Sequence, residues 1–143
     1  MLILLDTIIL VRYLSGEVIP ALEIMGNDIK GHIAASTMSA GEIVRMHGAG
    51  KLVLSVDLQR WLDAAQSTEM IRWIPVYPHV SMAAEQMENC PEEFDFYDRL
   101  IVATSKCFNV PLITGNRTIL NYGGCASVDY KDKRALTPFW ANR

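Results

Sequence analysis

Six oxygen-bearing side chains stand where predicted strands end or predicted helices begin, and they are the residues best placed to do chemistry. They are Asp6, Glu42, Asp95, Asp98, Thr114 and Asn116. Carboxylates gathered at one edge of a sheet repel one another, and a divalent cation relieves that repulsion. Oxygen ligands of this kind favour Mg²⁺ or Mn²⁺ over zinc. Such an ion can polarise a phosphate and activate a water molecule, so the set predicts metal-assisted hydrolysis of a phosphodiester.

Each of these residues also has an ordinary structural interpretation. Asp6 or its neighbour Thr7 could cap a helix, and residues 39–42 (SAGE) have the spacing of a capping box. Asp95 and Asp98 fit an N-cap followed by an acid in the first helical turn. Asn116 suits a cap or a turn. The recurrence of such residues at one kind of position favours a shared site over separate caps.

The elements that must position these residues alternate between strands and helices. Apolar runs predict strands over residues 1–5, 31–36, 70–76 and 110–114, with a fifth short strand over 125–128. Helical spacing predicts helices from Thr7 to the break at Gly16 and over residues 18–25, 39–47, 57–66, 80–87, 97–108 and 117–121. This alternation predicts an α/β fold with a mostly parallel sheet of four to five strands. Ligands of such folds bind beyond the carboxyl ends of the strands, where the acidic residues fall.

Length and composition restrict the class of protein. A chain of 143 residues suits one domain, residues 1–143, with residues 129–143 as a C-terminal tail. The net charge of −3 argues against broad wrapping of nucleic acid, so any such contact is local or bridged by metal. The apolar start is too short to span a bilayer and lacks signal-peptide features, so we expect a cytoplasmic protein with no membrane partner. Three widely spaced cysteines predict reduced thiols rather than a disulfide framework or a zinc site.

Five stretches of the sequence together resemble a known family. They are residues 4–7 (LLDT), 36–43 (STMSAGEI), 50–52 (GKL), 94–103 (FDFYDRLIVA) and 110–117 (VPLITGNR). Their order and spacing, from Met1 to about Tyr122, resemble PIN-domain ribonucleases, and most of all the VapC toxins of toxin–antitoxin modules. The pair Asp6-Thr7 and the run Asp95-x-x-Asp98-Arg-Leu carry most of this resemblance.

The resemblance implies a PIN-like three-layer sandwich, with the central sheet flanked by helices, and a Mg²⁺-dependent endoribonuclease acting as the toxin of a type II module. It places the catalytic residues at Asp6, Glu42, Asp98 and Asn116. The expected ligands of Mg²⁺, for which Mn²⁺ can substitute, are Asp6, Asp98, Glu42 and Asp95, and no organic cofactor is expected. The chain departs from the family at Asn116, where a fourth acid is usual.

The resemblance also implies three partners: an RNA substrate, a cognate antitoxin protein and a second copy of the chain. The homodimer has support in the sequence itself, because the early helices are unusually apolar and exposed apolar patches mark interfaces. The residues concerned are Leu10, Tyr13, Leu14, Leu22, Met25 and Trp61.

Two other functions compete with a nuclease. A catalytically weakened PIN-fold protein that mainly binds a protein or RNA partner is favoured by Asn116 and opposed by the retained acids Asp6, Glu42 and Asp98. A receiver domain would also carry Mg²⁺ at an acidic edge. However, the strand over residues 70–76 is followed by Tyr77 and Pro78 rather than by an aspartate that could be phosphorylated, which opposes this interpretation.

Overall fold

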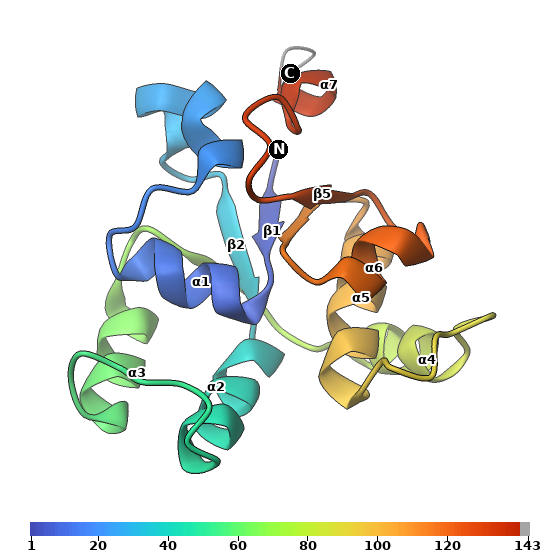
Figure 1. Ribbon diagram of the computed structural model, residues 1–143, viewed down its shortest axis with the longest axis horizontal. Coiled ribbons are helices and arrows are strands. Elements are labelled where there is room, and N and C mark those ends of the chain that lie inside the picture. The colour runs from blue at the N-terminus through green and yellow to red at the C-terminus, as the bar shows by residue number, and fades with distance from the viewer. Residues whose placement is uncertain (141–143) are drawn as a thin grey trace.

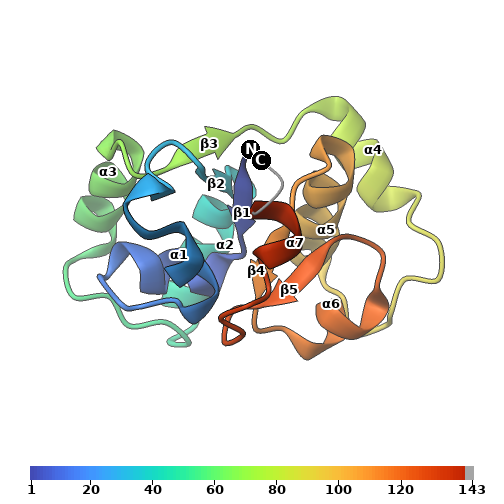
Figure 2. The same cartoon turned by 90° about the horizontal axis from the view of Figure 1, so that it is seen from above.

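One parallel sheet forms the centre of the chain. The computed structural model (Figure 1) describes residues 1–140, and within them five strands lie in the order β3-β2-β1-β4-β5, with every pairing parallel (Figure 2). The strands are β1 (Ile3–Leu5), β2 (Ile33–Ser36), β3 (Arg72–Ile74), β4 (Leu112–Thr114) and β5 (Ser127–Asp129). The predicted α/β architecture is confirmed. The order also separates the fold from a receiver domain, whose flavodoxin-like sheet has the order 2-1-3-4-5.

Helices cover both faces of the sheet and make it a three-layer sandwich (Figure 2). They are α1 (Thr7–Leu14), the 3₁₀ helix η1 (Pro20–Ile29), α2 (Met38–Gly48), α3 (Leu58–Ser67), α4 (Pro78–Glu85), α5 (Phe96–Phe108), α6 (Arg117–Tyr122) and α7 (Thr137–Trp140). Alternate side chains of a strand point to opposite faces, so Ile3 and Leu5 join the apolar cluster under α1, η1, α3 and α7. Leu4 joins the cluster under α4, α5 and α6. No helix within residues 1–140 is long and apolar enough to cross a membrane.

Burial on both faces explains why the central strands are apolar runs. Every residue of β1, β2 and β4 is buried, whereas Arg72 of the edge strand β3 is exposed. Each central strand ends at the same edge of the sheet, and the next polar residue can then begin a helix there. Asp6 does so directly after β1, because its carboxylate accepts a hydrogen bond from the Ile9 amide at 3.1 Å and caps α1.

The apolar residues of the early helices are used inside the chain. Leu10, Leu22, Met25 and Trp61 are all buried in the cluster beneath α1, η1 and α3. Tyr13 and Leu14 pack against the same cluster and are only partly exposed. Four of the six residues named for a homodimer are therefore not available at the surface, although Ile8 and Ile24 of the same helices are exposed.

The segment after β5 is part of the domain rather than a tail. Leu136 is 0% exposed and Trp140 is 3% exposed, and both belong to the cluster under α1 and η1. The charged residues at 131–134 favoured a tail, although Leu136, Phe139 and Trp140 have the spacing of one helix face. Residues 141–143 of the predicted tail lie outside the described residues.

Three further predictions were wrong in detail. The expected α-helix over residues 18–25 is the 3₁₀ helix η1, which begins at Pro20 and is interrupted at Gly26, where φ is +51°. Proline suits the first position of a helix because its missing amide has no partner there. The strand expected over residues 70–76 is limited to Arg72–Ile74, and the fifth strand runs over Ser127–Asp129 rather than 125–128.

Candidate active site

Asp6 lies at the centre of the site, between β1 and β4. Besides capping α1, its carboxylate accepts a hydrogen bond from the Thr114 hydroxyl at the end of β4. Burial raises the pKa of Asp6 above its ordinary value, although the bonds from Thr114 and the Ile9 amide and the charge of Arg12 act to lower it. A carboxylate held by this many donors is fixed in position while still costly to ionise.

Asp98 enters the site from the first turn of α5. The predicted cap is confirmed as a full capping box: Asp95 accepts a hydrogen bond from the Asp98 amide at 2.8 Å, and Asp98 accepts one from the Asp95 amide at 3.1 Å. Burial raises the pKa of Asp98 to about 6, and the negative charges of Asp95 and Asp6 add to the rise.

Asn116 faces Asp98 from the start of α6. Its side-chain oxygen caps that helix by accepting hydrogen bonds from the amides of Thr118 and Ile119. Its side-chain nitrogen lies 3.5 Å from an oxygen of Asp98. The amide thus satisfies both neighbours at once, whereas a carboxylate here would face the carboxylate of Asp98.

Glu42 reaches the site from α2, but not through a capping box. Helix α2 begins after Thr37, which makes no side-chain cap, and the buried Ser39 hydroxyl instead bonds the Thr7 hydroxyl at 3.0 Å. The interpretation of residues 39–42 as a capping box is therefore wrong, because the Ser39 hydroxyl bonds Thr7 of α1 instead. Burial raises the pKa of Glu42, a hydrogen bond from Thr7 lowers it, and the charges of Asp95 and Asp98 raise it further.

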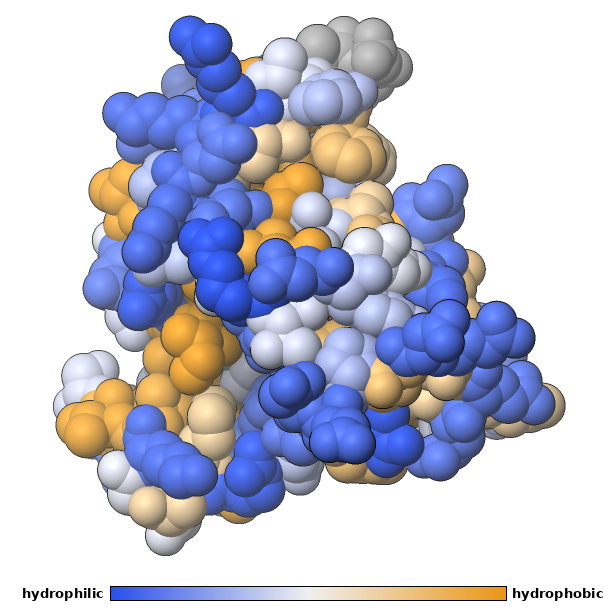
Figure 3. Space-filling model, turned by 45° about the vertical axis from the view of Figure 1, so that its right-hand side comes forward, coloured by the Kyte–Doolittle hydropathy of each residue, from blue (hydrophilic) through white to orange (hydrophobic). Residues whose placement is uncertain are grey.

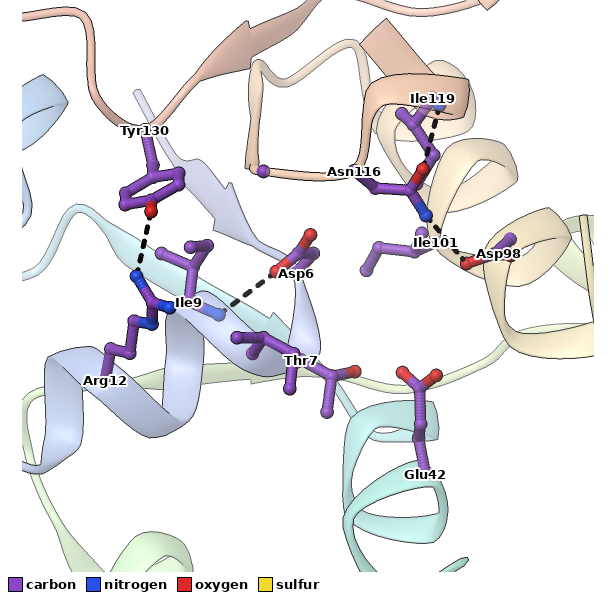
Figure 4. Close-up of a pocket in the computed structure, with 12 residues that line it drawn as sticks. Asp6, Thr7, Ile9, Arg12, Glu42, Asp98, Ile101, Asn116, Ile119 and Tyr130 are labelled. Atoms are coloured by element: carbon purple, nitrogen blue, oxygen red, sulfur yellow. Dashed lines mark hydrogen bonds between the residues drawn. The ribbon is translucent and has the colours of Figure 1, made fainter. Parts of the chain in front are cut away.

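These side chains line one pocket of about 370 Å³ at the carboxyl edge of the sheet (Figure 4). The lining residues are Asp6, Thr7, Ile8, Ile9, Arg12, Glu42, Asp98, Ile101, Gly115, Asn116, Ile119 and Tyr130. All four predicted catalytic residues are among them: three come from the start or first turn of a helix, and Glu42 comes from the second turn of α2. The close-up shows Glu42, Asp98 and Asn116 on one side of Asp6, and Arg12 with Tyr130 on the other.

Asp95 is the predicted ligand that the structure does not bring into the pocket. Its carboxylate is occupied by the capping box and by Arg45, whose guanidinium lies 3.4 Å away. Arg45 also lies 3.7 Å from Glu42 and stacks over the ring of Tyr97 at 5.1 Å. Asp95 thus acts on the site through its charge and through α5, and Arg45 offsets part of the acidity on this side.

The donors in the pocket fit a hard divalent cation by their chemistry. Asp6, Glu42 and Asp98 each have a pKa raised chiefly by burial, and the charges of neighbouring acids add to the rise at Glu42 and Asp98. Mg²⁺ and Mn²⁺ take such oxygen ligands and keep several water molecules in their shell. Within residues 1–140 no three Asp, Glu, His or Cys side chains stand close enough to form a ready-made metal cage. The fit therefore rests on the kind of donors and not on a finished coordination shell.

The raised pKa of Asp98 predicts a pH-dependent stability. The folded carboxyl group binds its proton more tightly than the unfolded one, so between about pH 4 and pH 6 the folded state holds more protons. Stability of the metal-free protein should then fall as pH rises through this window and level off above it. Thermal unfolding of wild type and Asp98→Asn in EDTA from pH 4 to pH 7 checks this. The melting temperature of the wild type should fall relative to that of the variant as pH rises. A difference in melting temperature that stays constant with pH would contradict the prediction.

Two pocket residues, Arg12 and Tyr130, were missed by sequence reasoning. Arg12 donates a hydrogen bond to the Tyr130 hydroxyl at 2.9 Å, and its guanidinium lies 5.1 Å from the centre of the Tyr130 ring. A β-carbon on Gly115 would lie 2.8 Å from that ring, so the position needs glycine to let the ring approach. Arg12 could have been found from its place six residues after Asp6 on the same predicted helix. Tyr130 lay in the supposed tail and gave no signal.

Comparison with known proteins identifies the fold. No protein-family model and no curated protein sequence matches the chain. Solved structures do match: "Toxin-antitoxin complex from Klebsiella pneumoniae" has 19% identity over 90% of this chain and 97% of that one, with a TM-score of 0.59. VapBC2 from Rickettsia felis, bound to a promoter DNA fragment, has 20% identity over 90% and 98%, with a TM-score of 0.64. VapBC-1 from nontypeable Haemophilus influenzae has 18% identity over 92% and 100%, with a TM-score of 0.65.

These matches run over almost the whole of both chains, so the likeness concerns the domain and not a fragment of it. At this level of identity it concerns the fold alone. The resemblance noted in the sequence is thereby confirmed for the architecture: the chain has the PIN-like α/β sandwich found in VapBC toxin–antitoxin structures.

Proposed function

We propose that this chain is a Mg²⁺-dependent endoribonuclease that acts as the toxin of a toxin–antitoxin module. The observation that carries the proposal is the convergence of Asp6, Glu42 and Asp98, from three separate elements, on one pocket. The pocket lies beyond the carboxyl ends of β1 and β4, where parallel sheets bind their ligands. The similarity of the fold to toxin–antitoxin structures supports the biological role.

The residues of the pocket divide the work of phosphodiester hydrolysis. Mg²⁺ held by Asp6, Glu42 and Asp98 would supply a Lewis acid for the phosphate and a more acidic water as nucleophile. Thr114 donates to the carboxylate of Asp6, so this carboxylate is oriented before substrate arrives, and Thr7 lines the same pocket as Glu42. The apolar side chains of Ile9, Ile101 and Ile119 line the same pocket and limit the number of competing water molecules.

Removal of the metal should abolish the activity. Purified protein is expected to cleave RNA with Mg²⁺ or Mn²⁺ and to lose cleavage in EDTA, because both the substrate and the pocket are negatively charged without a cation. Cleavage of a labelled RNA, followed by gel electrophoresis with EDTA and then with added Mg²⁺, tests the proposal. Equal cleavage in EDTA would refute the metal mechanism. RNA binding without cleavage at any Mg²⁺ concentration would favour the alternative of a weakened PIN-fold binding protein, for which Asn116 is the specific feature.

A change of Asn116 to Asp should raise the affinity for Mg²⁺ about tenfold. The new carboxylate adds a charge and a stronger oxygen donor beside Asp98. It can still cap α6, but its repulsion with Asp98 should make the metal-free variant less stable. Ligand binding stabilises by mass action, so Mg²⁺ should raise the melting temperature of the variant more than that of wild type. Asn121→Asp, on the exposed side of the same helix, is the control. Equal Mg²⁺-induced shifts in all three proteins would place Asn116 outside the metal site.

The proposed protein partner is an antitoxin that covers apolar surface next to the pocket. A second hollow of about 460 Å³ is lined by Ile8, Val11, Arg12, Ser15, Glu17, Leu52 and Val53, and it shares Ile8 and Arg12 with the acidic pocket. Val53 is 91% exposed there. On the face drawn in Figure 3, apolar side chains lie in small groups between polar ones. The proposal also includes a homodimer located in the cytoplasm. The mass of the protein in solution tests whether it is a dimer.

A further inference from the structure

One side of the acidic pocket is basic, and it consists of Arg12, which is held in place by Tyr130. Among the described residues that line the pocket, Arg12 is the only basic one. Its guanidinium donates to the Tyr130 hydroxyl at 2.9 Å and lies over the Tyr130 ring. Tyr130 is itself anchored through its backbone, since its amide bonds the Thr114 carbonyl at 3.1 Å and its carbonyl accepts from Ala21 at 2.9 Å. Arg12 is thus held at the pocket by a side chain from the far end of the sequence.

The ion pairs of Arg12 do not explain this position. Within residues 1–140 its one ion pair joins it to Glu17 at 3.9 Å, and both side chains are about half exposed, at 42% and 59%. An exposed pair at that distance contributes little. A guanidinium has five N–H donors, and the bond to Tyr130 uses one of them. Arg12 therefore presents unused donors and a full positive charge at the mouth of the acidic pocket.

The position of Arg12 also fits the path that a bound RNA strand would take across the surface. Arg12 and Ile8 line both the acidic pocket and the second hollow beside it. A chain that leaves the acidic pocket along α1 must pass over Arg12. A phosphodiester strand carries one phosphate per nucleotide, so a neighbour of the reacting phosphate needs a counter-charge that the acids cannot give. Arginine suits this because its planar fork of donors matches phosphate oxygens.

We propose that Arg12 binds a phosphate of the RNA strand adjacent to the one that is cleaved, and that Tyr130 is a positioning residue that holds Arg12 for this contact. This inference rests on the proposed nuclease function. The pocket then has two ends. The acidic end binds the phosphate that reacts, and the basic end binds the neighbouring phosphate and so fixes the position of the RNA strand. The contact reads the backbone and not the bases, so it should be independent of RNA sequence.

Salt dependence of RNA binding gives the sharpest test. The probe is a fluorescein-labelled single-stranded oligoribonucleotide of mixed sequence, titrated with the full chain in Mg²⁺, in an Asp98→Asn background that blocks cleavage. Arg12→Gln should weaken binding about tenfold at low salt. It should also make the plot of log affinity against log salt shallower by about 0.7, because one phosphate contact to a single strand is lost.

Three further variants separate charge from structure. Arg12→Lys keeps the charge and should keep the salt slope. Tyr130→Phe keeps the ring and removes the hydroxyl, so it should weaken binding by about threefold to tenfold without changing the slope. Lys30→Gln is the matched control, because Lys30 is an exposed cation paired with Glu69 outside both hollows, and its loss should change neither affinity nor slope. Melting temperatures of all variants show whether each is folded.

The outcomes separate this inference from the proposed function. A folded Arg12→Gln variant with wild-type affinity and slope would overturn the inference even if the wild type cleaves RNA. A shallower slope for Arg12→Gln would support the phosphate contact even if no cleavage is found, in which case the nuclease function alone fails. If Arg12→Gln keeps its RNA slope but loses binding to a candidate antitoxin, Arg12 is a protein contact and the inference is wrong.

Discussion

Replacement of Asp6 by Asn should lower RNA cleavage by on the order of 10³-fold while the protein remains folded, because a charge that stabilises the reacting centre is removed. The amide oxygen of Asn can still accept the Ile9 amide and cap α1, and the Thr114 hydroxyl can turn to accept from the new NH₂ group. Burial makes the native carboxylate costly to ionise, so the metal-free variant should be at least as stable as wild type. Cleavage rates with Mg²⁺, together with melting temperatures in EDTA, measure the two effects.

Asp57→Asn is the matched control for this substitution. Asp57 caps α3 just as Asp6 caps α1, by accepting from the amide three residues on at 3.0 Å, but it does not line the acidic pocket. The control should keep wild-type cleavage. If Asp6→Asn cleaves RNA as well as Asp57→Asn does, then Asp6 is a cap and nothing more, and the proposed metal site loses its central ligand.

The residues of the site could be predicted where local and global signals agree. An apolar run followed by Asp6 indicates a buried strand and then a helix cap, and the structure contains both. The capping box of Asp95 and Asp98 is likewise local, since its partners are three residues apart. Parallel strands end at one edge of a sheet, so placing these caps in a predicted α/β fold also brought Asp6, Glu42, Asp98 and Asn116 to one pocket.

The errors came from partners far away in the sequence. Ser39 has the right spacing to Glu42 for a capping box, but its hydroxyl bonds Thr7, 32 residues earlier. Asp95 is an aspartate at the N-cap of a helix, as the proposed ligand Asp6 is, but Arg45 from α2 engages the carboxylate of Asp95. Spacing along the chain contains no information on which of two neighbours a polar side chain will choose, because that choice is made by the packing of helices.

The contact between Arg12 and Tyr130 could be predicted from the sequence even less. Arg12 and Tyr130 are 118 residues apart, and their contact exists only because β5 is the last strand of the sheet and the chain then turns back over η1. Residues 131–134 are four charged residues in a row, which is typical of an exposed segment. Leu136 and Trp140 contradict this, because both are buried in the apolar cluster that also contains residues of α1 and η1. The position of this segment is therefore set by packing against residues far away in the sequence.

Leu136→Ala should accordingly destabilise the whole domain by about 2–5 kcal/mol, the usual cost of emptying a fully buried leucine site. For a chain of this length each kcal/mol corresponds to roughly 3–6 °C in melting temperature, so the fall should be easily measured by calorimetry or circular dichroism. Val53→Ala is the control: Val53 is 91% exposed, and its change should stay within about 0.5 kcal/mol. A loss of less than about 1 kcal/mol for Leu136→Ala would mean that the segment after β5 is not part of the core.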